Sequence, residues 1–154
     1  MKRLATLFLL SLFFISCGNK EKSEDFSKSS SEEPMSTSDY DPNRGLGKYQ
    51  NMELSPNLDH QMAALGEAAS GTKCLSCHKL NSERLVGPGW EGVTIRRTPE
   101  WIMNFITDPD PMIDVDPELQ AQLELCLVRM PNQNISDDEA RQILEYMRQN
   151  DGVQ

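Results

Sequence analysis

The chain has 154 residues, with 15 basic and 24 acidic side chains and a formal net charge of −9 at neutral pH. This acidity disfavours nucleic acid as a partner and disfavours electrostatic binding to an anionic membrane surface. It favours solubility or cationic protein partners. The chain has only four cysteines and two histidines, so few residues of these types are available to bind a metal or a cofactor.

The first 16 residues have the pattern of an export signal. Lys2 and Arg3 precede an apolar run that ends at Ile15, as in a secretory signal peptide. The run has about 12 residues, fewer than the roughly 20 that a membrane-spanning helix needs. The sequence therefore predicts a signal peptide over residues 1–16, and its removal leaves 13 basic and 24 acidic residues, a net charge of −11.

Cys17 follows the apolar run, and the segment from Phe14 to Gly18 resembles the lipobox of bacterial lipoproteins. In that family the cysteine is acylated and becomes the first residue of the mature protein. The family usually has leucine where this chain has Phe14. The resemblance implies a lipid on Cys17, and several acyl chains would make the anchor stable. An ordinary secretory signal followed by an incidental cysteine is the alternative.

Residues 17–57 have the composition of a flexible tether behind the acylated cysteine. The stretches 20–25 and 27–33 are rich in serine and charge and nearly free of apolar residues, so they cannot bury enough surface to offset the entropy of ordering. A flexible coil of about 40 residues has a root-mean-square reach of roughly 35 Å. The sequence therefore predicts a tether over 17–57 and a folded domain over 58–154.

The stretch Cys74-Leu75-Ser76-Cys77-His78 has the spacing of a c-type haem attachment site. Side chains at i and i+3 share one face of a helical turn, so both thiols can reach the vinyl groups of one porphyrin. His78 can then offer its imidazole to the iron. A zinc site needs about four ligands and a redox dithiol needs a βαβ context, and neither accompanies the motif. One haem c, covalently attached through Cys74 and Cys77, is predicted.

Cap residues and apolar spacing predict four helices in the folded domain. Asp59, Thr98 before Pro99, and Asp116 before Pro117 are helix starts, and Ser136 with Glu139 forms a capping box. Gly71 is expected to end the first helix. The expected limits are 59–71, 98–107, 116–128 and 136–149. Cys126 is expected to be a buried small apolar side chain on a broad apolar face that includes Leu125.

Several of these features together resemble class I cytochromes c. Gly66 lies eight residues before Cys74, where the family has a glycine that packs against the C-terminal helix. Ser70 stands where the family has an aromatic residue. The resemblance covers about residues 58–149 and implies an all-α domain with the small cytochrome c fold, four to five helices around one covalently bound haem.

The same resemblance implies roles for two further residues. Gly87-Pro88 resembles the Gly-Pro loop of the family, in which the proline carbonyl accepts the second ring N–H of the proximal histidine and fixes its tautomer. Met130-Pro131, followed by a polar loop and a capped helix, resembles the region that supplies the second axial ligand. His78 and Met130 are therefore the expected iron ligands, and Pro88 the expected partner of His78.

Other candidates for the second ligand stay open. Met112 is expected in a loop between two proline turns, and His60 at the start of the first helix. An iron with an open position is the remaining possibility. A methionine ligand raises the reduction potential, whereas a second histidine lowers it.

The resemblance implies a one-electron carrier and not an enzyme. A membrane-tethered protein of this kind passes electrons from a quinol-oxidising complex to a terminal reductase, such as nitrous-oxide reductase, or to an oxidase. The haem domain would face the periplasm. Five basic residues near the haem motif are expected either to form a positive rim for an acidic partner or to be scattered solubility charges: Lys73, Lys79, Arg84, Arg96 and Arg97.

Two other functions are considered. A haem-based sensor or catalytic haem subunit would displace Met130 and bind NO, CO or peroxide at the iron, although no distal acid or base for peroxide chemistry is evident. A cytochrome subunit held permanently in a larger complex would need a large hydrophobic interface.

Overall fold

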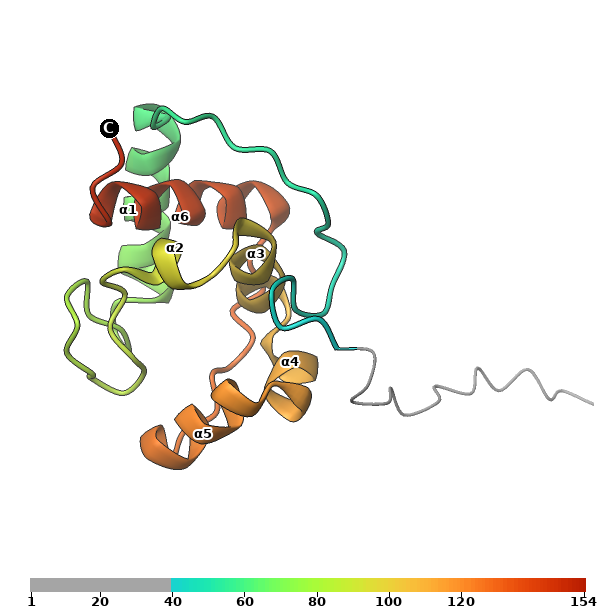
Figure 1. Cartoon of the computed structure of the whole chain (residues 1–154). Coiled ribbons are helices and arrows are strands. Elements are labelled where there is room, and N and C mark those ends of the chain that lie inside the picture. The colour runs from blue at the N-terminus through green and yellow to red at the C-terminus, as the bar shows by residue number, and fades with distance from the viewer. Residues whose placement is uncertain (1–39) are drawn as a thin grey trace, which may run out of the picture. The chain divides into compact units, whose positions relative to one another are not determined.

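The computed structural model describes residues 40–154, which belong to one compact unit. Residues 1–39 lie outside this part, and with them the predicted signal peptide, Cys17 and the first half of the tether. The helices are α1 (His60–Lys73), α2 (Val93–Arg96), α3 (Pro99–Thr107), α4 (Pro109–Val115), α5 (Pro117–Cys126) and α6 (Asp137–Asn150) (Figure 1). Residues 40–154 contain no strand, so the all-α prediction is confirmed, with α2 and α4 as helices that the sequence did not predict.

The helix starts follow from local capping, as predicted. The Asp59 carboxylate accepts from the backbone N–H groups of Gln61 and Met62, and the Thr98 hydroxyl accepts from that of Trp101. Ser136 and Glu139 form the reciprocal capping box of α6. These side chains satisfy N–H groups that have no partner within their own helix.

The expected end of α1 at Gly71 is wrong. Gly71 is not among the glycines with positive φ, so it does not form a left-handed cap, and the helix continues to Lys73. The expected end of the third predicted helix at Val128 is also wrong. Leu127 has φ 59°, in the left-handed region, and this residue ends α5 after Cys126.

α1 and α6 form the closest helix pair of the domain (Figure 1). α1 buries Ala63, Gly66 and Ser70, and α6 buries an apolar face that includes Ile143 and Leu144. A β-carbon at Gly66 would lie 2.0 Å from the carbonyl oxygen of Gln142. The predicted packing of Gly66 against the last helix is therefore confirmed.

The prediction that the tether extends to residue 57 is wrong for residues 40–57. In the structure this segment lies along α3 and then leads into α1 (Figure 1). The buried side chain of Asn104 accepts from the Tyr49 backbone N–H at 2.9 Å and donates to the Arg44 carbonyl at 3.0 Å. Lys48 pairs with Asp137 at 2.5 Å. The polar composition of residues 40–57 does not predict these contacts, because their partners are about 50 to 90 residues away in the sequence.

The expectation that Met112 lies in a loop is also wrong. It lies on α4, fully buried, with its terminal methyl against Gly45. Pro109 and Pro111 occupy the first turn of this helix, where the N–H groups that proline lacks would have no helical partner. The two prolines therefore start a helix here instead of separating two turns.

Within the described part of the chain, no helix combines the length and the hydropathy needed to cross a bilayer.

Candidate haem site

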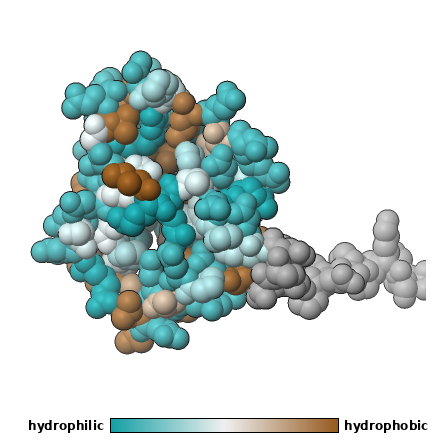
Figure 2. Space-filling view, in the orientation of Figure 1, coloured by the Kyte–Doolittle hydropathy of each residue, from teal (hydrophilic) through white to brown (hydrophobic). Residues whose placement is uncertain are grey.

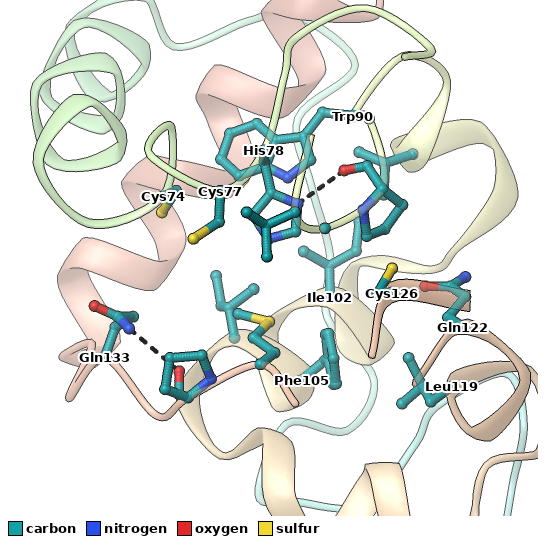
Figure 3. A pocket seen from close by; sticks show the side chains of 18 of the residues that line it. Cys74, Cys77, His78, Trp90, Ile102, Phe105, Leu119, Gln122, Cys126 and Gln133 are labelled. Atoms are coloured by element: carbon teal, nitrogen blue, oxygen red, sulfur yellow. Dashed lines mark hydrogen bonds between the residues drawn. The ribbon is translucent and has the colours of Figure 1, made fainter. Parts of the chain in front are cut away.

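A cavity of about 570 Å³ lies between the Cys74–Trp90 segment and helices α3, α5 and α6. Its apolar lining includes Ile102, Phe105, Leu119 and Ile143. Figure 3 shows Cys74, Cys77 and His78 on one side of the cavity, with Phe105, Leu119 and Cys126 across from them. A cavity of this size with an apolar wall and a few convergent polar groups is typical of a cofactor site.

The Cys74–His78 motif forms a tight turn at the end of α1. The backbone N–H groups of Cys77 and His78 both donate to the carbonyl of Cys74 at 3.0 Å, which brings both thiols and the imidazole to the same cavity. Both thiols are free and half-buried. Burial raises the pKa of the Cys74 thiol. The turn therefore brings both thiols and the ring to one cavity, an arrangement consistent with attachment to one porphyrin.

The imidazole of His78 is fixed from behind by the Gly-Pro loop. Its Nδ1 lies 2.8 Å from the carbonyl oxygen of Pro88, the contact predicted from the resemblance. This carbonyl can only accept, so Nδ1 carries the proton and Nε2 keeps its lone pair for a metal. Burial lowers the pKa of His78, and the hydrogen bond to Pro88 acts in the opposite direction. A neutral imidazole with Nε2 unprotonated is the form that binds iron.

Gly87 allows this close approach. A β-carbon at Gly87 would lie 2.5 Å from Cε1 of His78. The loop is held in place because the backbone N–H groups of Val86 and Gly87 both donate to the carbonyl of Cys77, at 3.1 and 2.8 Å. Trp90 completes the proximal side, with its ring centroid 5.8 Å from that of His78.

Of the three candidate side chains for the second iron ligand, only one lines the cavity that contains His78. Met130 is half-buried in the segment between α5 and α6 and lines the same cavity as His78. Met112 is not part of the cavity lining. His60 is exposed and lines a different cavity, formed with Ser55 and Arg141. Met130 is thus the candidate that the fold brings to the site, and its role as ligand stays a prediction.

Several lining residues were not assigned to the site from the sequence. Ile102 and Phe105 belong to the apolar stripe of α3, which is visible in the sequence, and this stripe faces the cavity. Cys126 is half-buried and lines the cavity, which contradicts the expectation of a buried side chain on a broad apolar face. Leu125, its neighbour on that expected face, is 68% exposed.

The residues present fit a covalent haem. Two thiols, an imidazole with one ring nitrogen available, and a thioether sulfur border one apolar cavity, and these are the groups that attach and ligate haem c. Residues 40–154 contain no cluster of three or more histidine, cysteine or acidic side chains arranged to hold a metal ion directly.

Comparisons with known proteins agree with this site. The family model "Cytochrome c" matches residues 63–151. The solved structure of a cytochrome c from Rhodothermus marinus is 35% identical, with 68% of this chain and 90% of that chain covered and a TM-score of 0.65. An engineered Rhodothermus marinus cytochrome c, Rma TDE, is 34% identical over the same shares, with a TM-score of 0.65. The same engineered protein bound to a carbene intermediate has a TM-score of 0.61. No curated protein matches the chain.

The match covers more than half of the chain, from within α1 to the residue after the end of α6. Members of this family bind haem c covalently through a cysteine pair, and they are in general electron carriers. Cys74 and Cys77 have the position and spacing of that pair. The chain therefore belongs to the cytochrome c family.

Proposed function

We propose that this protein is a membrane-tethered one-electron carrier, with His78 and Met130 as the two axial ligands of its haem. The observation that carries the proposal is the His78–Pro88 hydrogen bond of 2.8 Å, which leaves Nε2 of His78 available in a cavity that Met130 also lines. Haem supplies one reversible electron at its iron when it is bound. Pro88 fixes the orientation of His78, and apolar side chains of this chain surround the site.

The ligand pair favours electron transfer over ligand chemistry. With both axial positions filled by protein, a small molecule would have to displace Met130 before it could bind. Apolar walls such as Ile102 and Phe105 exclude water, and low solvent exposure together with a methionine ligand raises the reduction potential. The site is therefore suited to cycling between two oxidation states without a change of ligand.

A small-ligand function remains the second candidate, because an engineered Rhodothermus marinus cytochrome c has been solved with a carbene intermediate bound. For this chain the two candidates differ in their response to carbon monoxide. We expect the ferrous protein to show no change in its visible spectrum under CO within seconds of mixing, together with full reversibility in a redox titration. Rapid and complete CO binding would instead favour the sensor or catalytic function.

We further propose that a lipid on Cys17 holds the protein on a bacterial membrane with the haem domain in the periplasm. The lipobox-like segment before Cys17 and the tether composition of the residues that follow it support this. The electron donor would be a quinol-oxidising complex, and the acceptor a terminal reductase, such as nitrous-oxide reductase, or an oxidase. In a bacterial host, Cys17→Ser should move the haem protein from the membrane fraction to the soluble periplasmic fraction. Retention of the variant in the membrane would contradict the lipid anchor.

A further inference from the structure

Exposed apolar side chains of the described domain gather at the mouth of the haem cavity. Seven large apolar side chains are exposed in residues 40–154, and five of them lie on two short segments. We call these five residues the mouth patch: Leu85, Val86, Leu125, Leu127 and Val128. Val86 and Val128 also line the cavity itself, so the patch is continuous with the site. Figure 2 shows that hydrophobic atoms otherwise form only small areas on a mostly hydrophilic face.

Arg84 holds the two segments of the mouth patch together. Its guanidinium donates to the carbonyl oxygen of Leu125 at 2.9 Å, across 41 positions in the sequence. This carbonyl belongs to the last turn of α5, whose carbonyl groups lack helical partners. Leu125 and Leu127, at 68% and 85% exposure, therefore lie beside the loop that carries Leu85. Apolar side chains grouped and exposed in this way mark an interaction site more often than chance.

Charge distinguishes the same region. Residues 40–154 contain 10 basic and 18 acidic side chains. Eight of the basic residues lie within 4.0 Å of a carboxylate: Arg44, Lys48, Lys73, Lys79, Arg97, Arg129, Arg141 and Arg148. The two without such a partner in the described part, Arg84 and Arg96, both lie at the cavity, where Arg96 is part of the lining.

The expected positive rim is correspondingly reduced. Of its five members, three are neutralised by ion pairs, namely Lys73 with Glu139, Lys79 with Glu83 and Arg97 with Glu118. Exposed pairs of this kind cancel each other's field at a distance. What surrounds the haem site is mainly apolar, with two uncompensated arginines.

We propose that the mouth patch is the docking surface for the apolar contact face of another redox protein, which presents a carboxylate to Arg84. The inference rests on the proposed electron-carrier function. A transient electron-transfer interface is small, and its centre is apolar and poor in charge. Because association is driven by apolar burial, it depends little on ionic strength, whereas a basic rim would be strongly screened by salt.

Two other occupants are less compatible with the charges. In a symmetric dimer each patch meets itself, so Arg84 would face the Arg84 of the second copy in a poorly solvated contact, which is unfavourable. An anionic membrane would be repelled by a domain with a net charge of −8. A protein that carries apolar and acidic groups together matches both features.

Voltammetry of the holoprotein on gold electrodes tests this, with a methyl-terminated alkanethiol monolayer as the probe. We expect reversible, adsorbed electron transfer that changes little between low and high salt. The double variant Leu125→Ser/Leu127→Asn should reduce the adsorbed signal at least about tenfold, because two apolar contacts are removed. Asparagine tolerates the left-handed backbone at position 127. Leu65→Ser, which changes an exposed leucine on α1, is the matched control and should leave the signal unchanged.

A second comparison tests the carboxylate. On a mixed methyl- and carboxylate-terminated monolayer, Arg84→Gln should weaken adsorption severalfold more than Lys48→Gln. The latter removes the same charge from the ion pair with Asp137. Equal effects of these two variants would overturn the role of Arg84.

The docking surface is overturned if Leu65→Ser and the double variant behave alike, or if the wild type transfers electrons only at a purely carboxylate-terminated monolayer. Binding to neutral phosphatidylcholine vesicles through the same leucines would overturn it in favour of a membrane contact. In each of these cases a reversible redox titration in solution leaves the electron-carrier function standing. Failure of that titration would remove both proposals.

Discussion

The backbone of Gly66 on α1 lies directly against the carbonyl group of Gln142 on α6. A β-carbon at Gly66 would lie 2.0 Å from the carbonyl oxygen and 2.5 Å from the carbonyl carbon. Backbone atoms cannot move aside as a flexible side chain can. The contact leaves no room for a side chain between the two helices, and Cys74 of the haem motif follows immediately after α1.

Gly66→Ala should therefore separate α1 from α6 and lower the free energy of unfolding by about 1–3 kcal/mol, the usual cost of overpacking. Chemical denaturation of the holoprotein, followed by far-UV circular dichroism, measures this change. Gly71→Ala is the control. Nothing lies within 4 Å of a β-carbon at Gly71, so alanine there should stabilise α1 by about 0.5–1 kcal/mol. If Gly66→Ala and Gly71→Ala changed the free energy of unfolding by the same amount and in the same direction, the close packing at Gly66 would be contradicted.

Asn104→Ala should release the segment 40–57 from α3. Asn104 is 1% exposed, and its amide also donates to the carbonyl of Tyr49 at 3.0 Å. Its loss leaves the Tyr49 N–H and two carbonyl groups without partners, at a cost of about 2–4 kcal/mol. Faster hydrogen exchange of the Tyr49 amide should accompany the loss. Asn43→Ala, on the exposed part of the same segment, is the control. It should change neither the free energy of unfolding nor the exchange rate of the Tyr49 amide. Unchanged exchange at Tyr49 in the Asn104 variant would show that the segment is held by other contacts.

Acid should destabilise the domain partly through Glu139. The ion pair with Lys73 and the backbone N–H of Ser136 lower the pKa of Glu139 in the folded protein. Its ionised form therefore contributes stability above the unfolded pKa of about 4.3, and this contribution is lost as the pH falls through the lower folded value. Urea unfolding at a series of pH values should show a shallower acid dependence for Glu139→Gln.

The control for that experiment is Glu124→Gln, which changes an exposed glutamate on α5 outside every ion pair of the described domain. This variant should keep the acid dependence of the wild type. Parallel curves for all three proteins would show that Glu139 does not contribute.

Covalent haem should be required for a compact domain. The cavity of about 570 Å³ would leave its lining without packing partners in Cys74→Ser/Cys77→Ser, at a cost on the order of 10 kcal/mol if it did not collapse. Typical domains have only about 5–15 kcal/mol of stability. Size-exclusion chromatography and circular dichroism of the haem-free variant should show an expanded chain with reduced helicity. A compact and fully helical apoprotein would contradict this expectation.

Features encoded by neighbouring residues were predictable from the sequence. The caps at Asp59, Thr98 and Ser136 depend on hydrogen bonds to N–H groups two or three residues away, so a short stretch of sequence contains all the information. The haem motif is similarly short in range. The His78–Pro88 contact, ten positions apart, was predictable only through the resemblance to class I cytochromes c.

Features set by distant partners were not predictable. Residues 40–57 are held by contacts with Asn104 and Asp137. The composition of a polar segment does not show that it has such distant partners. The sequence predicts a loop around Met112 because proline usually ends a helix, whereas Pro109 begins one here. The ion pairs that neutralise Lys73 and Arg97 also join distant segments, so a list of basic residues overstated the positive charge around the site.

His78 and Met130 are the two proposed ligands of the haem iron. The near-infrared sulfur-to-iron charge-transfer band of the ferric protein tests this pair most directly, because this band requires a thioether ligand. We expect the band in the wild type and in Met112→Ala, whose methionine lies on α4 and does not line the cavity. In Met130→Ala the band should be absent, and the reduction potential should fall. A band that persists in Met130→Ala, or that is absent from the wild type, would contradict the ligand pair and the account of the site built on it.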